Sequence, residues 1–304
     1  MSWLTINDYG SAGWANVGDP APQSRHYCAE LEKGAILFFP GPPFDLPRED
    51  MEFLVSLTPA DSRLHKNISY RPEQDVLRGF SDGAHEARVH EIMRRYAAEA
   101  RKFVSSFLTP YAGKFQMDYA SFRPLEEEGR DLPVHKKNDL LHVDAFPSRP
   151  TRGGRILRVF TNVHPSKDRV WMVAERFPEL AARVADQTGL KKFANASRAL
   201  EGVKRGLGNL GLPIPDRAPY DEFMLHLHDW LKENSGLQIS KNGKERVEFP
   251  PMSTWLVYTD GVLHSTLSGQ FAMEQTFIVP VEALVVPEVS PLRVLEQLSG
   301  RTMS

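Results

Sequence analysis

The residues with the clearest chemical potential lie in segment 140–146, which reads Leu-Leu-His-Val-Asp-Ala-Phe. Its apolar residues predict a strand, and side chains two positions apart in a strand lie on the same face. His142 and Asp144 would then both point to the inside of a rolled sheet, with Val143 facing away. An imidazole and a carboxylate on one face form part of a metal site, although two protein ligands are too few for firm binding.

A third ligand is expected from a distant strand, because a rolled sheet brings opposite edges face to face. His264 fits, since it follows an expected strand at 254–258 and a turn at 259–261, and precedes another strand. Two imidazoles and one carboxylate leave three adjacent metal positions open, as in non-haem Fe(II) oxygenases. We therefore predict an Fe(II) site made of His142, Asp144 and His264. In the structural alternative, Asp144 only holds His142 inside a core, because a buried charge needs a partner.

The other histidines are weaker ligand candidates. His226, His228 and Asp229 fall in an expected helix, where residues two apart do not face each other. We interpret this cluster as structural. His135 and His164 flank the expected strands and are interpreted as solvated loop residues that could touch substrate.

An Fe(II) oxygenase needs electrons to activate O₂, and 2-oxoglutarate can supply two by oxidative decarboxylation to succinate. Its 2-oxo acid end would chelate iron, and its far carboxylate needs a fixed cation, preferably an arginine. Many such enzymes have that cation shortly after the second histidine, where this chain has Glu274. The candidates are therefore Arg158 and Arg123. Asn162 would share a strand face with Arg158, and Gln275 could line the same pocket. The alternative for Arg158 is a surface salt bridge. The alternative for Gln275 is an ordinary edge-strand residue.

Basic residues surround the expected mouth of the site. Between 136 and 158 the chain has two acidic residues, Asp139 and Asp144, and six basic ones: Lys136, Lys137, Arg149, Arg152, Arg155 and Arg158. This excess would attract an anionic substrate, for which we expect Lys136, Lys137, Arg149, Arg152 and Arg155 to be contacts. The alternative is a loop whose charges only keep it soluble.

The elements that must position these residues predict a mainly β chain with helices (α+β). Short β-rich pieces are expected at 34–39, 119–122, 140–145, 156–163, 247–249, 254–258 and 275–281. Helices are expected at 82–110, 172–185, 220–232 and 292–298. The helix at 82–110 has apolar residues at spacings of three and four: Val89, Ile92, Met93, Tyr96, Ala100, Phe103, Val104 and Phe107. Strands that resume after a helical stretch, without βαβ alternation, predict an antiparallel double-stranded β-helix, the cupin-like jelly roll.

We expect a single dioxygenase domain over 1–304, with no linker that divides it. Its parts would be an N-terminal support of helices and strands (1–114), the β-helix core (115–165 and 236–285), a mostly helical insertion (166–235) and a C-terminal tail (286–304).

Composition limits the function classes. The 304 residues carry a net charge of −2, which argues against a general nucleic-acid binder. The single cysteine, Cys28, cannot form an internal disulfide, so a reducing cytoplasm is expected. The N-terminus lacks the basic start and apolar stretch of a signal peptide, and no apolar run is long enough to span a bilayer, which leaves peripheral membrane binding open. The oligomeric state is left open.

Several motifs resemble those of the Kdo hydroxylases, bacterial Fe(II)/2-oxoglutarate-dependent dioxygenases that act on the 3-deoxy-D-manno-oct-2-ulosonic acid (Kdo) of lipopolysaccharide. The matching pieces are Gly-Ala-Ile-Leu-Phe-Phe-Pro at 34–40, His-Val-Asp-Ala-Phe-Pro-Ser-Arg-Pro-Thr at 142–151, Arg-Val-Phe-Thr-Asn at 158–162, Asp-Gly-Val-Leu-His at 260–264 and Glu-Gln-Thr at 274–276. The resemblance implies hydroxylation of C3 of Kdo on a lipid A precursor, with 2-oxoglutarate converted to succinate and CO₂. It also implies a Kdo-containing glycolipid as partner and work at the cytoplasmic face of the inner membrane.

Two other functions use the same residues. A cupin-like metal-dependent sugar isomerase or epimerase would need the three ligands but would not consume O₂. A non-catalytic module that binds an anionic glycolipid would need only the basic segment.

Overall fold

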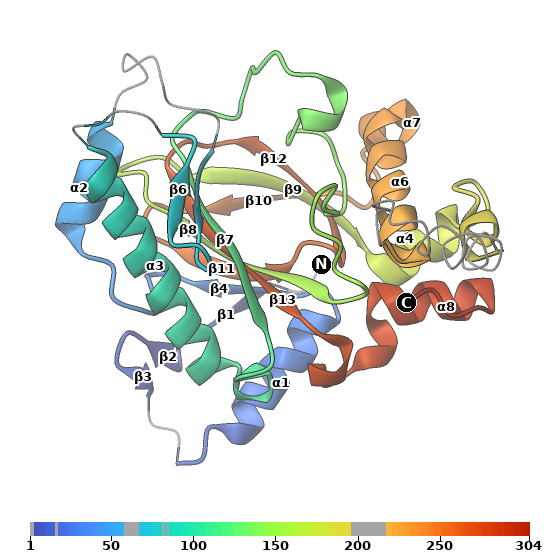
Figure 1. Ribbon diagram of the computed structural model, residues 1–304, viewed down its shortest axis with the longest axis horizontal. Coiled ribbons are helices and arrows are strands. Elements are labelled where there is room, and N and C mark those ends of the chain that lie inside the picture. The colour runs from blue at the N-terminus through green and yellow to red at the C-terminus, as the bar shows by residue number, and fades with distance from the viewer. Residues whose placement is uncertain (1–2, 16–17, 58–66, 81–82, 84, 196–216) are drawn as a thin grey trace, which may run out of the picture.

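Two β-sheets form the centre of the protein, and helices cover them on two sides (Figure 1). The computed structural model describes residues 3–15, 18–57, 67–80, 83, 85–195 and 217–304. The larger sheet has the strand order β1 (Trp3–Thr5), β4 (Ile36–Phe39), β11 (Thr254–Tyr258), β8 (Arg155–Asn162), β13 (Ala272–Val279), β7 (Gln116–Arg123), β5 (Ile68–Arg71) and β6 (Val76–Arg78). The smaller sheet has the order β10 (Glu245–Phe249), β9 (Arg169–Arg176) and β12 (Val262–Ser268). β1 pairs with β4 in parallel, and the other pairings of these two sheets are antiparallel.

Three helices cover the outer face of the large sheet. They are α1 (Ala21–Glu32), α2 (Arg48–Ser56) and α3 (Glu86–Phe107). All eight apolar positions predicted for the longest helix are buried on α3. The expected cap at 81–82 lies outside the described residues, and α3 begins at Glu86. The lone cysteine, Cys28, is fully buried in this helix-covered core, where burial raises the pKa of its thiol.

A second group of helices packs at the other end of the molecule (Figure 1). It comprises α4 (Phe177–Val184), α6 (Pro219–Glu233), α7 (Ser235–Ile239) and α8 (Pro291–Ser299). Their apolar side chains form one cluster with Leu141, Val143 and Leu263. The remaining elements are the hairpin β2 (Tyr9–Gly10) and β3 (Gly13–Trp14) and the 3₁₀ helices η1 (Thr109–Tyr111), η2 (Val134–Lys136), η3 (Val281–Ala283) and η4 (Pro287–Val289).

A third apolar cluster fills the space between the two sheets. Aromatic rings dominate it: Trp255 stacks on Phe249 with ring centroids 3.8 Å apart, and Trp171 meets Phe160 edge to face at 5.0 Å. Two facing, mostly antiparallel sheets with an apolar interior confirm the predicted α+β fold class.

Most expected elements match the structure, with two corrections. Segment 140–145 is not a strand, because only His142 forms an isolated bridge, with His264. The helix expected at 172–185 is wrong in its first part, where residues up to Arg176 belong to β9. Trp171 of β9 faces the inter-sheet cluster and Met172 packs against the helical cluster. Because both faces of β9 are covered, its sequence lacks the alternation of a half-exposed strand.

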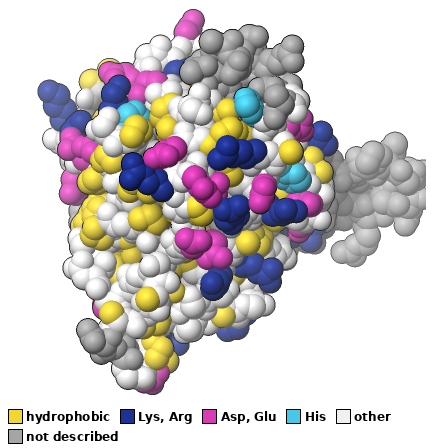
Figure 2. Space-filling model, turned by 90° about the vertical axis from the view of Figure 1, so that its left-hand side faces the viewer, with side chains coloured by type: hydrophobic (Ala, Val, Ile, Leu, Met, Phe, Trp, Pro, Cys, Tyr) yellow, Lys and Arg dark blue, Asp and Glu magenta, His cyan; other side chains and the backbone are white. Residues whose placement is uncertain are grey.

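The outer surface over α2 and α3 carries mixed charges. Figure 2 shows basic and acidic side chains next to one another on this face, with apolar atoms between them. Ion pairs such as Arg95–Glu91 at 3.2 Å and Arg94–Asp75 at 3.6 Å contribute to this pattern. Among the described residues, no helix combines the length and hydropathy needed to cross a bilayer.

Candidate metal centre

The structure brings His142, Asp144 and His264 together between the sheets and the second helix group. One potential ligand atom from each of the three lies within 4.8 Å of the others, and all three side chains are buried. His264 lies on β12 opposite Val173 of β9. The N–H groups of His142 and His264 each donate to the other residue's carbonyl at 3.0 Å, and the Asp144 N–H donates to the Thr259 carbonyl at 2.9 Å. These backbone bonds fix the ligand segment against β12 without a continuous strand.

Both histidines have the tautomer that suits metal binding. Nδ1 of His142 donates to the Leu140 carbonyl at 2.7 Å, and Nδ1 of His264 donates to the Val262 carbonyl at 2.9 Å. Each Nε2 is therefore the unprotonated nitrogen of a neutral ring. Burial lowers the pKa of His142 to about 3 and also lowers the pKa of His264. Both imidazoles are thus neutral at physiological pH, the form that binds a metal.

Asp144 supplies the negative charge. Burial alone would raise its pKa, but Arg158, whose Nη2 lies 3.1 Å from Oδ2, and the two histidines hold the pKa well below its usual range. This ion pair lacks hydrogen-bond geometry, so buried Oδ2 accepts no hydrogen bond from any residue that the structure describes. Two neutral imidazoles and an ionised carboxylate with an unused acceptor fit a divalent metal such as Fe(II).

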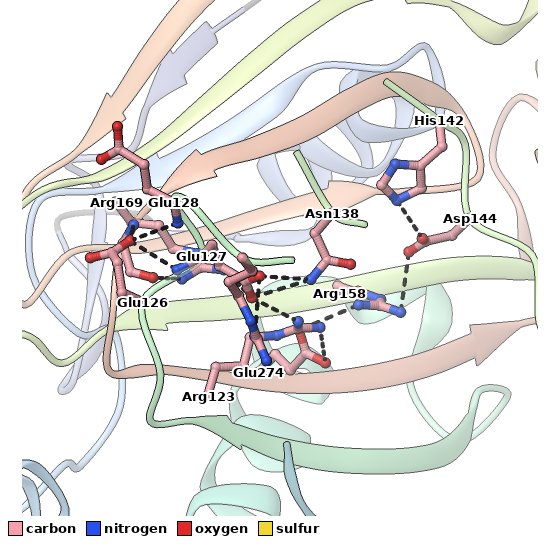
Figure 3. A network of polar contacts seen from close by, with 12 residues as sticks. Arg123, Glu126, Glu127, Glu128, Asn138, His142, Asp144, Arg158, Arg169 and Glu274 are labelled. Carbon is pink, nitrogen blue, oxygen red and sulfur yellow. Dashed lines mark hydrogen bonds and ion pairs between the residues drawn. The ribbon is translucent and has the colours of Figure 1, made fainter. Parts of the chain in front are cut away.

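A network of buried arginines and carboxylates continues from Asp144 (Figure 3). Glu274 accepts two hydrogen bonds from Arg123, from Nε at 3.0 Å and from Nη2 at 3.1 Å. Arg158 donates to Glu274 at 3.3 Å and so connects it to Asp144. Burial would raise the pKa of Glu274, but Arg123 and Arg158 lower it. Glu274, which has the wrong sign to anchor a carboxylate, is therefore the residue that holds both candidate arginines.

The structure contradicts the expected roles of two other pocket residues. Asn162 lies on the Arg158 face of β8, but its amide donates to the carbonyls of Lys167 and Phe249, both at 2.9 Å. Both of its N–H groups are therefore used within the fold. Gln275 pairs across the sheet with Val159, which belongs to the core under α3. Gln275 thus lies on the sheet face opposite the metal ligands.

The basic residues divide into three groups. Arg155 is buried and donates through Nε to Asp260 at 3.0 Å, so the structure contradicts its expected contact with substrate. Arg149 and Arg152 line a cavity of about 690 Å³ beside Phe146. The cavity also has three basic residues that the sequence interpretation missed: Arg71, Lys114 and Arg293. Lys136 and Lys137 lie elsewhere, next to His135, whose ring contacts Glu233 of α6 at 2.7 Å.

The rival histidine cluster stays outside the three-ligand group. His226 is exposed and contacts the ring of Phe193, whereas His228 approaches the ring of His142 edge to face at 5.0 Å. Residues two apart on α6 therefore diverge, as helix geometry predicts.

Two facing sheets with this two-histidine, one-carboxylate group define a jelly-roll protein of the non-haem iron dioxygenase class. More specifically, the chain belongs to the Kdo hydroxylase family, because the family model for 3-deoxy-D-manno-oct-2-ulosonic acid (Kdo) hydroxylase matches residues 14–302. This confirms the family resemblance.

Solved structures agree with the family model. The crystal structure of the Kdo hydroxylase KdoO, a non-haem Fe(II) α-ketoglutarate-dependent dioxygenase, in complex with α-ketoglutarate and Fe(III) is 33% identical, with a TM-score of 0.82 over 100% of this chain and 97% of that chain. The KdoO structure with cobalt(II) gives the same values, and the one with succinate and Fe(III) has a TM-score of 0.81. Comparison with curated proteins finds no match.

Proposed function

We propose that this protein is an Fe(II)/2-oxoglutarate-dependent dioxygenase that hydroxylates C3 of Kdo in a lipid A precursor and converts 2-oxoglutarate to succinate and CO₂. The observation that carries this proposal is the buried group of His142, Asp144 and His264, with its potential ligand atoms within 4.8 Å of one another. The protein's membership in the Kdo hydroxylase family supports Kdo as the substrate. A lipid-linked acceptor would place the protein's work at the cytoplasmic face of the inner membrane.

The three ligand residues would hold the iron, which with 2-oxoglutarate would supply the O₂ chemistry. Arg158 is our candidate for the far carboxylate of 2-oxoglutarate, since it lies between Asp144 and Glu274 at 3.1 Å and 3.3 Å. Arg123, one step further from the ligands, is the second candidate. Trp171, stacked on His264, contributes to the apolar wall that excludes water from this side of the site.

The cavity beside Phe146 supports a binding site for the anionic acceptor. Arg149 lies over the rings of Tyr119 and Phe146, with its guanidinium carbon 4.0 Å and 4.3 Å from the ring centroids. Arg158 lies 5.7 Å from the centroid of the same Phe146 ring. Because one aromatic ring lies near both arginines, an acceptor held by Arg149 and Arg152 would extend toward the metal ligands.

Activity measurements test the proposal. Protein loaded with Fe(II) should release succinate in air when given 2-oxoglutarate and a Kdo-bearing lipid A precursor, and the sugar should gain one oxygen by mass. His142→Ala should abolish both signals. His226→Ala, which changes an exposed histidine of α6, should leave them intact.

Two outcomes would contradict the proposal. Conversion of the acceptor under argon without 2-oxoglutarate would indicate the isomerase or epimerase. A biological effect that survives His142→Ala would indicate the binding module.

A further inference from the structure

The segment that carries His142 and Asp144 has an edge with which no strand pairs in the part of the chain that the structure describes. His142 exchanges both backbone hydrogen bonds with His264, so the peptide groups of its neighbours Leu141 and Val143 point away from β12. In a sheet, the next strand would bind these groups. Here α6 and α7 occupy that side, and the side chains of Leu141 and Val143 are buried in the helical cluster.

Two helical side chains bind the peptide groups that β12 leaves unpaired. Oε1 of Gln238, on α7, accepts from the Leu141 N–H at 2.9 Å, and its Nε2 donates to the Leu141 carbonyl at 3.0 Å. Nε2 also donates to the Leu231 carbonyl at the end of α6, at 2.8 Å. On α6, His228 Nδ1 donates to the Val143 carbonyl at 2.8 Å. The amide of Gln238 thus supplies the same donor and acceptor pair that a neighbouring strand would offer.

We propose that Gln238 and His228 are positioning residues for the metal: they replace the missing strand and fix the backbone from which His142 and Asp144 project. The inference rests on the proposed metal site and adds that α6 and α7 are needed for its affinity. Leu141 and Val143 alternate with the two ligands along the chain, so a shift of their peptide groups moves the ligands directly. The ring of His228 also contacts that of His142, which limits its rotation.

The strength of these contacts follows from their burial. A peptide group that loses its hydrogen-bond partner in a buried site is destabilising, and Gln238 binds two such groups of Leu141. Outer contacts that orient metal ligands typically change metal affinity by about 10- to 100-fold when removed. We therefore expect the main effect of substitution in metal affinity.

Cobalt(II) titration of the metal-free full chain by calorimetry tests the inference. Gln238→Leu and His228→Phe should each weaken binding by about 10- to 100-fold. His226→Phe makes the same chemical change two residues away at an exposed position and should bind as the wild type does. His228→Asn, whose Nδ2 can replace the donor Nδ1, should recover part of the loss.

Thermal unfolding of the metal-free variants separates positioning from general damage. Each variant should still unfold cooperatively. The absorption spectrum of cobalt(II) bound to Gln238→Leu or His228→Phe should differ from that of the wild type. Wild-type affinity in both Gln238→Leu and His228→Phe would overturn it, as would equal losses in His226→Phe and His228→Phe. Failure of the wild type itself to bind cobalt(II) would instead contradict the proposed function.

Discussion

At the scale of single residues, Glu274 shows how buried charges are arranged around the candidate metal centre. It lies on β13 and accepts hydrogen bonds from Arg123 of β7 and Arg158 of β8. The residue is 4% exposed, so water cannot readily take the place of its carboxylate as the partner of these arginines. One carboxylate therefore keeps two guanidinium groups in place beside Asp144.

Replacement of this carboxylate should destabilise the fold. Glu274→Gln keeps the shape but leaves two buried cations without their shared charge, so we expect a loss of about 3 kcal/mol in the free energy of unfolding. Urea denaturation of the metal-free protein measures it. Glu282→Gln, at an exposed position, is the matched control and should change the value by less than about 0.5 kcal/mol. A similar, small effect for both variants would contradict the role of Glu274.

His164 should make stability depend on pH. Its Nδ1 accepts from the N–H groups of Ser166 and Lys167, at 3.1 Å and 2.9 Å, and burial followed by the charge of Lys167 lowers its pKa below the usual 6.5, against an opposing effect of Glu126. As the pH falls, His164 is therefore protonated in the unfolded chain before it is protonated in the folded protein. The stabilisation that depends on neutral His164 is fully present above about pH 6.5 and is lost as the pH falls toward the lower folded pKa.

The matched variants at this position differ in their ability to titrate. His164→Asn keeps an acceptor for the two N–H groups but cannot take up a proton. Urea unfolding between about pH 7.5 and about pH 5 should show a shallower pH dependence for His164→Asn than for the wild type. His26→Asn, at an exposed position, should leave the slope unchanged. Identical slopes for His164→Asn and wild type would refute the assignment.

The sequence could predict the types and spacing of the site residues better than their partners. The sequence predicted the three metal ligands, His142, Asp144 and His264, because a two-residue spacing and a strand–turn context are local patterns. The contact of Arg158 with Glu274 depends on strands far apart in the chain, whose register is not visible in one sequence. Gln275 was misplaced for the same reason, since a one-residue change of register moves a side chain to the other face.

At the scale of elements, the turn between β11 and β12 connects the metal ligands to the buried pair Arg155–Asp260. Gly261 lies in this turn, and a Cβ atom there would meet the guanidinium of Arg155. That guanidinium cannot move freely, because Asp260 accepts from it at 3.0 Å and the ring of Tyr258 lies 4.1 Å from its central carbon. The glycine is thus required by packing rather than by its backbone angles.

A methyl group at this turn should lower stability. We expect Gly261→Ala to cost about 1–3 kcal/mol, the usual range for overpacking in a dense core. Gly41→Ala is the control, since a Cβ at position 41 meets nothing within 4 Å. Chemical denaturation of the two variants measures the difference. Equal stabilities of Gly261→Ala and Gly41→Ala would show that the Arg155 guanidinium can move to make room for the methyl group.

The long helix α3 was predictable because its single buried face gives a regular apolar spacing. β11 is buried on both faces, and its bounds follow from the turn residues on either side of it. β9 was taken for a helix because its sequence lacks strand alternation and runs directly into α4, and segment 140–145 was taken for a strand because it has strand-like alternation without a second partner. The helices α1 and α2 were not predicted, because α1 has few apolar residues and α2, with nine residues, is too short to show a clear period.

At the scale of the whole molecule, the candidate metal centre joins parts that are separate in sequence. His264 belongs to the smaller sheet, whereas the segment of His142 and Asp144 packs on the second helix group through Leu141 and Val143. A metal bound to all three would crosslink the sheet and the helices. Ligand binding to the folded state alone raises the free energy of unfolding.

Metal removal should therefore lower thermal stability. At a free cobalt(II) concentration about 100 times Kd, the folded protein should gain about 2.7 kcal/mol over the chelator-treated form. Thermal unfolding with cobalt(II) and with chelator measures the shift. Asp144→Ala removes one ligand and should lose the metal-dependent part. Equal unfolding temperatures for wild type with and without metal would contradict a site that spans the two parts.

The stacking of Trp171 on His264, with ring centroids 5.1 Å apart and planes at 25°, has a practical consequence. A paramagnetic ion such as Fe(II) or Co(II) on His264 would lie close to an indole and should quench its fluorescence. Site occupancy would then be readable from native emission, without any added dye. Trp171→Phe, which keeps an aromatic ring on the imidazole, should remove that signal while metal still binds.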